Sequence, residues 1–440
     1  MRKILLALLF AAGCVWLAGP GRAAGPMDVL FDGTQGERPA EDLGALMDSS
    51  GGVVPELGAI AGVDDRYWVS IRADGPAERT RLADLGMAIE SVDGGLVEGV
   101  ARPEELRKIR LAGFRVEKRT PLRSFGPEDF PARDDIYHNY GETEAELKAI
   151  AAAAPDIASV FPIGKSVEGR SITAIRFHMP GIQAGDKPGI LFTGTHHARE
   201  HLSTEVPLRL ARWLAENRER PEVRPLLETR DIYIVPLVNP DGSEFDIGTG
   251  RYQWQRKNMR PNGNGSVGVD LNRNYGYGWG GQGSSGYSNS DTYRGPSAFS
   301  EPETQAVRDF VEAHPNVTIL LTYHSFSELI LYPWGHMTEP ISDGKALGAY
   351  QAMAAEMAKM TGYRPMQSSG LYVASGDTCD WAWGEKKIFC FTFELTPRGR
   401  WSGGFYPGPE AVESSVRKNI APALYLIDLA DDPGRAAGAG

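Results

Sequence analysis

The sequence predicts an α/β protein: a mostly parallel, mixed sheet with helices on both faces, preceded by a small α+β unit. Two observations predict it. From residue 136 onward, short apolar stretches typical of strands alternate with longer stretches that have the spacing of amphipathic helices. Upstream, residues 66–118 contain a second, self-contained pattern of strands and helices. A chain of 440 residues is long enough for one large core and one smaller core.

The N-terminus has the pattern of an export signal. Two basic residues precede an almost entirely apolar stretch at 4–18, and a small-x-small sequence ends at Ala23. We therefore predict a signal peptide at 1–23 and a secreted or periplasmic protein. An alternative is a lipid anchor at Cys14, which follows three small residues. The apolar stretch is short for a membrane span and no later segment resembles one, so we expect no stable membrane association.

A lead-in at 24–65 is rich in Gly, Asp and Ala and is predicted to be poorly ordered. The small unit at 66–118 then has the order β-α-β-β-α-β, which is ferredoxin-like. The expected elements are a strand at 67–71, a helix at 76–85, two strands within 87–101 around the turn signal Asp93-Gly94-Gly95, a helix at 103–112 and a strand at 114–117.

A linker at 119–135 follows, with three prolines, several charges and little apolar pattern. Exposed segments of this kind are common sites of proteolysis, so Arg119, Arg123 and Arg133 are candidate cleavage points.

The large domain is predicted to span 136–431, before a flexible tail at 432–440. Expected strands lie at 172–177, 190–193, 231–238, 317–323 and 388–395, and expected helices at 207–217, 301–313, 345–361 and 409–429. In sheets of this kind, ligands bind beyond the carboxyl ends of the strands. The net charge of −11, without any basic stripe, argues against nucleic acid and anionic membranes as partners.

One such strand end is followed by THHAREHLST at 195–204, which holds three of the eight histidines of the chain. Imidazole and carboxylate are good ligands for zinc. The spacing alone does not choose among His196, His197, Glu200 and His201, and a polar surface loop is the alternative to a metal site.

A catalytic zinc site commonly has three protein ligands, so a third ligand is expected from another strand end. His324 directly follows the apolar strand at 317–323 and therefore lies at the same edge of the sheet. Position alone leaves three other histidines open: His178, His314 and His336.

Five short motifs occur in order, with Arg256 and Tyr372 between them: His197-Ala198-Arg199-Glu200, Asn239-Pro240-Asp241-Gly242, Asp270-Leu271-Asn272-Arg273-Asn274, His324-Ser325 and Phe391-Thr392-Phe393-Glu394. Together they resemble the zinc carboxypeptidases of the pancreatic A/B type, including bacterial carboxypeptidase T-like members. The resemblance runs over 137–429, about two thirds of the chain. The unit at 66–118 is similar to the activation domain of that family in element order only, and we predict an inhibitory, fold-assisting prodomain that is cut off in the linker.

The resemblance implies a zinc-dependent metallocarboxypeptidase that binds one Zn²⁺ through His197, Glu200 and His324. Asp270 would fix the ring of His197. We expect a monomer whose substrates are the C-termini of peptides and proteins.

The resemblance also assigns the substrate site. Arg273 and Asn272 would hold the C-terminal carboxylate, a task that suits a planar guanidinium, and Tyr372 would close over it. Arg256 would stabilise the carbonyl oxygen, although sequence alone does not separate it from Lys257. Glu394, at the end of an apolar strand, would act as general base toward the water that zinc activates. Arg199 and Phe326 would line the site upstream of the scissile bond.

The side-chain pocket is expected to be built by residues 374–380. Cys379 stands where the family often sets its preference, and it is neither acidic nor bulky. Asp377 would accept Lys or Arg, as in bacterial members of mixed preference, or it is a turn residue after Gly376. Signal cleavage leaves Cys379 and Cys390 as the only cysteines; we predict that they form a disulfide, with two buried thiols as the alternative.

Two other functions remain as alternatives. One is a cell-wall peptide amidase or peptidase on the same fold, and the other is an inactive peptide-binding homologue. The complete set of ligands and base in the sequence favours an enzyme, and the Asn272, Arg273, Arg256 and Tyr372 set favours substrates with an ordinary C-terminal carboxylate.

Overall fold

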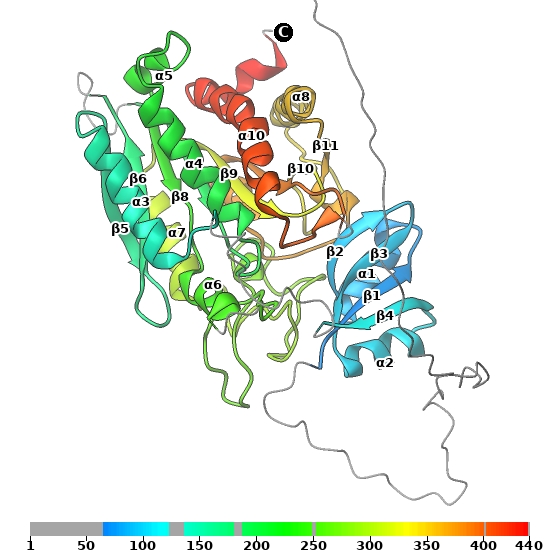
Figure 1. Cartoon of the computed structure of the whole chain (residues 1–440). Helices are drawn as coiled ribbons and strands as arrows, with labels where there is room; N and C mark the ends of the chain where they lie inside the picture. Colours follow the sequence, from blue (N-terminus) through cyan, green and yellow to red (C-terminus); the bar gives the residue numbers. More distant parts are fainter. Residues whose placement is uncertain (1–64, 123–135, 180–186, 249–251, 400–401, 439–440) are drawn as a thin grey trace, which may run out of the picture. The chain divides into compact units, whose positions relative to one another are not determined.

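The computed structural model describes residues 65–122, 136–179, 187–248, 252–399 and 402–438 (Figure 1). These residues belong to one compact unit, Gly62–Gly440. The predicted signal peptide, nearly all of the lead-in, and the linker residues Arg123 and Arg133 lie outside the described residues. In the part of the chain that is described, no helix has the length and apolar character needed to cross a membrane.

The small N-terminal unit has the predicted β-α-β-β-α-β order. Its elements are β1 (Tyr67–Arg72), α1 (Pro76–Asp84), β2 (Ala88–Asp93), β3 (Leu96–Ala101), α2 (Pro103–Leu111) and β4 (Val116–Pro121). The four strands form an antiparallel sheet in the order β2-β3-β1-β4. The last strand is longer than predicted, so Arg119 pairs with Val69 inside the sheet instead of lying in the linker.

The helices of this unit begin where the sequence indicates. Pro76 and Pro103 each occupy the first helical position, where the missing backbone N–H has no intrahelical partner to lose. Leu82 of α1 and Ile109 of α2 are fully buried in a core that they share with Val69 and other inward residues of the sheet. The unit therefore has a hydrophobic core of its own.

The large domain is built on an eight-stranded mixed sheet with the order β11-β10-β12-β9-β7-β8-β6-β5. Its strands are β5 (Ala158–Lys165), β6 (Ser171–Phe177), β7 (Gly189–Gly194), β8 (Asp231–Val235), β9 (Val317–Ser325), β10 (Leu329–Tyr332), β11 (Arg364–Gln367) and β12 (Phe389–Leu395). The central strands β12, β9, β7 and β8 run parallel to one another. The outer pairs β10–β12, β6–β8 and β5–β6 are antiparallel, as a mixed sheet requires.

Helices cover both faces of this sheet (Figure 1). One core lies against α3 (Tyr140–Ala153), α4 (Leu202–Glu216), α8 (Gly344–Thr361) and α10 (Pro409–Leu429). The other lies against α7 (Pro302–Ala313) and α9 (Thr378–Lys386). Short elements complete the chain: α5 (Arg224–Thr229), α6 (Pro240–Ile247) and the 3₁₀ turns η3 (Leu271–Arg273), η4 (Ser368–Gly370) and η6 (Pro433–Ala437). The predicted fold class is confirmed.

Helix α4 begins five residues before the position predicted from Pro207. The residues from Leu202 to Val206 are buried, and their packing against β7 outweighs the preference of proline for a first helical turn. Gly194, at the end of β7, makes this packing possible: a Cβ atom on Gly194 would lie 2.0 Å from the carbonyl oxygen of Ser203. The histidine-rich segment is thus held tightly between strand and helix.

The C-terminal segment also differs from the flexible tail that was predicted. Pro433 is buried at the start of η6. Arg435 pairs with Asp428 and Asp431, which ties this turn to the end of α10.

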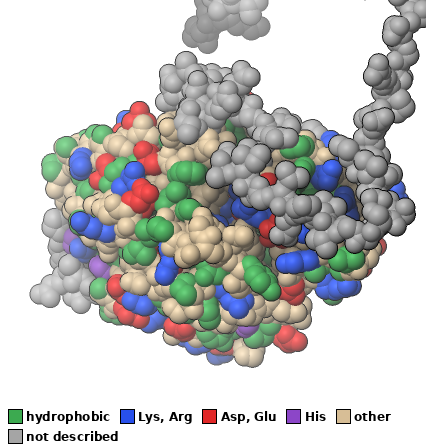
Figure 2. All heavy atoms as spheres, turned by 90° about the horizontal axis from the view of Figure 1, so that it is seen from below, with side chains coloured by type: hydrophobic (Ala, Val, Ile, Leu, Met, Phe, Trp, Pro, Cys, Tyr) green, Lys and Arg blue, Asp and Glu red, His purple; other side chains and the backbone are tan. Residues whose placement is uncertain are grey.

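The parallel strands bring the predicted site residues to one edge of the sheet. Gly194 of β7 lies opposite Tyr323 of β9, and His324 of β9 lies opposite Glu394 of β12. Because all three strands end here, the segments that follow them can meet. On the face shown in Figure 2, acidic and basic side chains are interspersed, in line with the absence of a basic stripe in the sequence.

Candidate active site

Three buried side chains converge at this edge of the sheet: His197, Glu200 and His324. The ligand atoms of the three residues all lie within 4.8 Å of one another. Glu200 Oε1 is 2.7 Å from His197 Nδ1, and Glu200 Oε2 is 3.0 Å from His324 Nδ1. The structure therefore brings together the three ligands that the resemblance implied.

The donor set fits zinc. The Nδ1 atoms of His197 and His324 face each other at 3.1 Å, close to the separation of about 3.3 Å that two nitrogens have on a tetrahedral zinc ion. Burial alone would raise the pKa of Glu200, but the two imidazoles lower it, so this carboxylate stays charged. Asp270 Oδ1 lies 3.3 Å from His197 Nε2, where it can hold the ring with Nδ1 turned to the metal.

The other candidate histidines are engaged elsewhere. His196 Nε2 is 2.8 Å from the Tyr275 hydroxyl, and His201 Nε2 is 2.9 Å from Asp246. The remaining candidates also have partners: Asp231 for His178, the Phe310 carbonyl for His314 and Asp380 for His336. None of these five histidines lies in the three-residue group.

A cavity opens beside the metal group. Polar residues that line it include His197, Glu200, Arg256, Asn272, Arg273, Tyr372, Asp377 and Glu394. They come from segments far apart in the sequence: the turn after β7, the loop before η3, η3 itself, the segment between η4 and α9, and β12. Most of the predicted substrate-site residues are thus gathered around one space.

Arg273 is a planar donor at the wall of this cavity. Its Nη2 donates to the Tyr372 hydroxyl at 3.1 Å, and its Nε donates to the Gly283 carbonyl at 3.0 Å. The side-chain oxygen of Asn272 accepts from the backbone N–H of Thr378 at 2.9 Å, so its amide group remains as a donor toward the cavity. These donors form a site suited to a carboxylate.

The structure separates Arg256 from Lys257, which the sequence could not do. Arg256 lines the cavity, and its Nε donates to Asp270 at 3.0 Å. Lys257 is buried outside the cavity lining, with its Nζ bound to the Ser288 carbonyl at 2.8 Å. Burial would raise the pKa of Asp270, but Arg256 and then Arg273 hold it well below its usual value.

Glu394 is the only acidic residue of β12 and projects into the cavity beside the metal group. Burial, followed by the nearby carboxylates of Glu200 and Glu90, raises its pKa well above the usual value. A carboxyl group in such a position is suited to exchanging a proton with a water.

Three of the residues predicted to bind substrate lie outside the cavity lining: Arg199, Phe326 and Cys379. Arg199 is fully buried and pairs with Glu90 and Asp291. Phe326 stacks on Trp68 of the small unit at a ring distance of 6.4 Å. These two upstream positions are therefore covered by other side chains of the chain.

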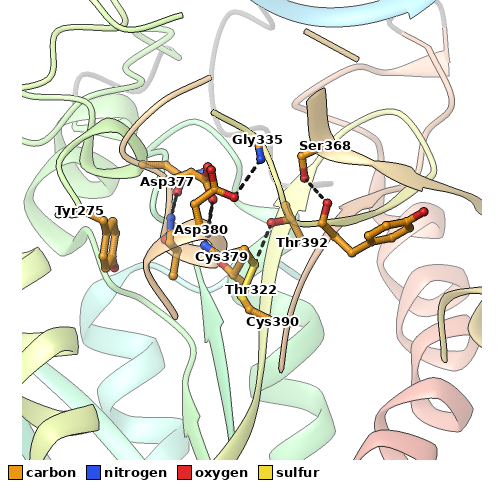
Figure 3. Close-up of a disulfide and its surroundings, with 12 residues drawn as sticks. Tyr275, Thr322, Gly335, Ser368, Asp377, Cys379, Asp380, Cys390 and Thr392 are labelled. Atoms are coloured by element: carbon orange, nitrogen blue, oxygen red, sulfur yellow. Dashed lines mark hydrogen bonds between the residues drawn. A yellow bond between two sulfur atoms is a disulfide. The ribbon is translucent and has the colours of Figure 1, made fainter. Parts of the chain in front are cut away.

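Cys379 lies behind the pocket wall, where it forms the predicted disulfide with Cys390 (Figure 3). The two Cα atoms are 5.0 Å apart, within the limit of about 7 Å for a bridge. The sulfur of Cys379 is 3.5 Å from the hydroxyl of Thr392, a cavity residue. The bridge therefore ties α9 to β12 just beneath the pocket.

Sequence reasoning missed Glu90. This residue belongs to β2 of the small unit, yet it lines the cavity together with Ile89. Its carboxylate pairs with Arg199 and lies 3.4 Å from Nη1 of Arg256. Nothing in the sequence pattern separates it from an ordinary polar residue of a half-exposed strand.

Comparisons with known proteins agree with this geometry. The zinc carboxypeptidase family matches residues 143–421. A zinc carboxypeptidase of Saccharothrix mutabilis subsp. capreolus is 32% identical over 390 residues, covering 83% of this chain and 89% of the relative. Carboxypeptidase A2 of Mus musculus is 34% identical over 303 residues, covering 68% and 71%. The crystal structure of carboxypeptidase A from Helicoverpa armigera aligns with a TM-score of 0.70 and 26% identity, covering 86% of this chain and 99% of that one.

The chain belongs to the zinc carboxypeptidase family. It is a zinc metallocarboxypeptidase, and its cofactor is one zinc ion, for which the group of His197, Glu200 and His324 is the fitting site.

Proposed function

We propose that the protein hydrolyses the C-terminal residue from peptides and proteins at the cavity described above. The observation that supports this most strongly is the joining of two groups in one cavity. The Arg273, Asn272 and Tyr372 set suits a free carboxylate, and it lies beside the metal group and Glu394. A carboxypeptidase needs its carboxylate-binding site and its catalytic group to be separated by no more than the length of one substrate residue.

In the proposed reaction, zinc, when bound, supplies a Lewis acid that lowers the pKa of water toward about 7. Glu394 takes a proton from the attacking water and passes it to the nitrogen of the leaving residue. Arg256 donates to the carbonyl oxygen as negative charge grows on it. Asp270 keeps Arg256 in place through the hydrogen bond to Nε.

The remaining residues bind and orient the substrate. Arg273 and the amide of Asn272 hold the terminal carboxylate, and the Tyr372 hydroxyl closes over it from its position 3.1 Å from Arg273 Nη2. Arg199 and Phe326 would contact the peptide upstream of the scissile bond once the side chains of the small unit are removed.

A direct assay separates this function from its two alternatives. We expect the processed enzyme to hydrolyse a blocked dipeptide with a free C-terminal carboxylate, and to be inactive after chelation. Turnover of muropeptide but not of the dipeptide would favour a cell-wall amidase. Binding of the dipeptide without turnover in the zinc-loaded protein would favour an inactive peptide-binding homologue.

We also propose that the small unit at 66–118 is an inhibitory prodomain of an exported, monomeric enzyme. The carboxylate of Glu90 forms ion pairs with Arg199 and Arg256, so these two donors are not available to a peptide substrate while the small unit is in place. Trp68 covers Phe326 in the same way. The match to the Helicoverpa armigera structure covers 86% of this chain, whereas the large domain at 136–431 makes up about two thirds of it. The match therefore extends into the small unit, which supports a fold shared by both parts of the chain.

Replacing Glu90 by Gln in the uncut chain is expected to raise its residual dipeptide hydrolysis about tenfold or more. Loss of one partner from a buried charge pair weakens an interface by about 2–5 kcal/mol, so the prodomain would release more readily. Glu117→Gln is the matched control, because Glu117 pairs with Arg72 at the surface of the same unit. Equal residual activities of the two uncut variants would contradict the role of Glu90.

The position of processing is a separate test. The window predicted for the start of the secreted active enzyme is about residues 120 to 136. Because Arg119 pairs within β4, which ends at Pro121, we expect N-terminal sequencing to place the start in the part of this window that lies beyond Pro121. A start near Ala24 in the fully active species would rule out an inhibitory prodomain.

A further inference from the structure

Two donors from a single residue hold the side-chain oxygen of Asn272, which lines the substrate cavity. This oxygen accepts from the backbone N–H and from the hydroxyl of Thr378, both at 2.9 Å. A backbone N–H can only donate, so the side-chain atom of Asn272 that it meets must be the oxygen and not the nitrogen. The N–H bonds of the amide have no acceptor among the described residues and are left for a ligand in the cavity.

Thr378 acts on this site without reaching it. It is fully buried, and it does not belong to the residues that line the cavity. The other polar neighbour of its hydroxyl is His196, whose Nε2 lies 3.4 Å away, so the contact of 2.9 Å with Asn272 is the shorter one. A buried hydroxyl that donates to a cavity residue can orient that residue but cannot touch the substrate.

The helical turn that carries Thr378 is itself held from two sides. Thr378 is the first residue of α9, and Asp377 caps this helix by accepting from two backbone N–H groups of its first turn, both at 2.9 Å. The next residue, Cys379, is bonded to Cys390 of β12 (Figure 3). Glu394 belongs to the same strand. The donors that hold Asn272 are therefore fixed relative to the strand that carries the proposed base.

Asn274, two residues further along, is held in a similar way but serves the fold. Its side-chain oxygen accepts from the hydroxyl of Thr304 at 2.8 Å and from the backbone N–H of Glu301 at 3.2 Å. Its amide nitrogen donates to two backbone carbonyls at 2.8 and 2.9 Å. The amide of Asn274 is thus used inside the protein, whereas the amide of Asn272 is kept for the cavity.

We infer that Thr378 is a positioning residue for recognition of the terminal carboxylate of the substrate. The inference rests on the carboxypeptidase function proposed above and adds a residue that sets specificity at its carboxylate site. Because Thr378 holds the oxygen of Asn272, only N–H groups face the ligand. A carboxylate accepts from them, whereas a C-terminal amide must place its own NH₂ group against a donor. Thr378 therefore favours free C-termini over amidated ones without contacting either.

The test is a double-mutant cycle in the processed, zinc-loaded enzyme, measured with a blocked dipeptide and with its C-terminal amide. Thr378→Val keeps the shape of the side chain and removes the hydroxyl, so KM for the acid should rise about three- to tenfold while kcat changes less than about twofold. The ratio of kcat/KM for the acid to that for the amide should fall by a similar factor. Thr378→Ser should restore both values. In an Asn272→Ala background, Thr378→Val should have no further effect.

Thr304→Val is the matched control, because it removes the corresponding hydroxyl from Asn274 and should leave KM within about twofold of the wild type. Thr378→Ala removes the same hydroxyl from a smaller side chain and gives the same comparison if Val packs badly. A wild-type KM and acid-to-amide ratio without the hydroxyl, or an undiminished effect in the Asn272→Ala background, would overturn the inference and leave the carboxypeptidase function intact. Failure of the wild type on the dipeptide would overturn both.

Discussion

Replacement of Glu394 by Gln is expected to lower kcat of the processed enzyme by about 10²–10⁴-fold while its zinc content and fold are unchanged. Gln keeps the size of the side chain but cannot take a proton from water. Glu394 enters the cavity from β12 opposite His324, so the base stands beside the metal group without being one of its ligands. The loss should therefore appear in kcat far more than in KM.

Glu339→Gln provides the control for this measurement, because Glu339 is exposed and lies outside the cavity lining. Steady-state kinetics on a blocked dipeptide and metal analysis would be done on both variants. A Glu394→Gln enzyme with near-normal turnover would remove this residue from the proposed mechanism.

Replacement of Arg273 by Ala is expected to lower kcat/KM for a free C-terminal carboxylate by about 10²–10³-fold. Truncating one partner of a buried, hydrogen-bonded charge pair costs about 2–5 kcal/mol, and each 1.4 kcal/mol is a factor of ten. Arg273 is 3% exposed and would form such a pair with the substrate. Arg273→Lys keeps the positive charge but lacks the planar guanidinium, so its kcat/KM should lie between the values of the wild type and of the Ala variant.

Comparing each dipeptide with its C-terminal amide makes this test specific. The wild type should discriminate strongly in favour of the free acid, and the Ala variant should lose most of that discrimination. If the Ala variant still prefers the acid as strongly as the wild type does, another group binds the carboxylate.

Much of the fold was predictable because its strands and helices have strong local patterns. The apolar strands at β7, β9 and β12 and the long helices α7, α8 and α10 lie within a few residues of their expected positions. Elements with weaker patterns were missed, among them β5, β10 and β11. Helix α4 was placed too late, because tertiary packing around Gly194 and Ser203 outweighed the local signal of Pro207.

The site divides in the same way. The positions of His324 and Glu394 at the ends of apolar strands predicted that both would meet the histidine cluster. They do so because β7, β9 and β12 run parallel and end at the same edge of the sheet. The resemblance supplied the choice among neighbours, such as Arg256 over Lys257, and the side-chain geometry is consistent with it. Glu90 could not be predicted, since its position depends on how two units with separate cores pack together, which no local pattern encodes.

The central claim is that His197, Glu200 and His324 hold one catalytic zinc ion, and metal analysis tests it most directly. Purified wild-type protein should contain about one zinc per chain. The His197→Ala, His324→Ala double variant should contain almost none and should not hydrolyse a blocked dipeptide, whereas a His178→Ala, His314→Ala control should keep both its zinc and its activity. Full zinc retention by the first double variant would contradict the account.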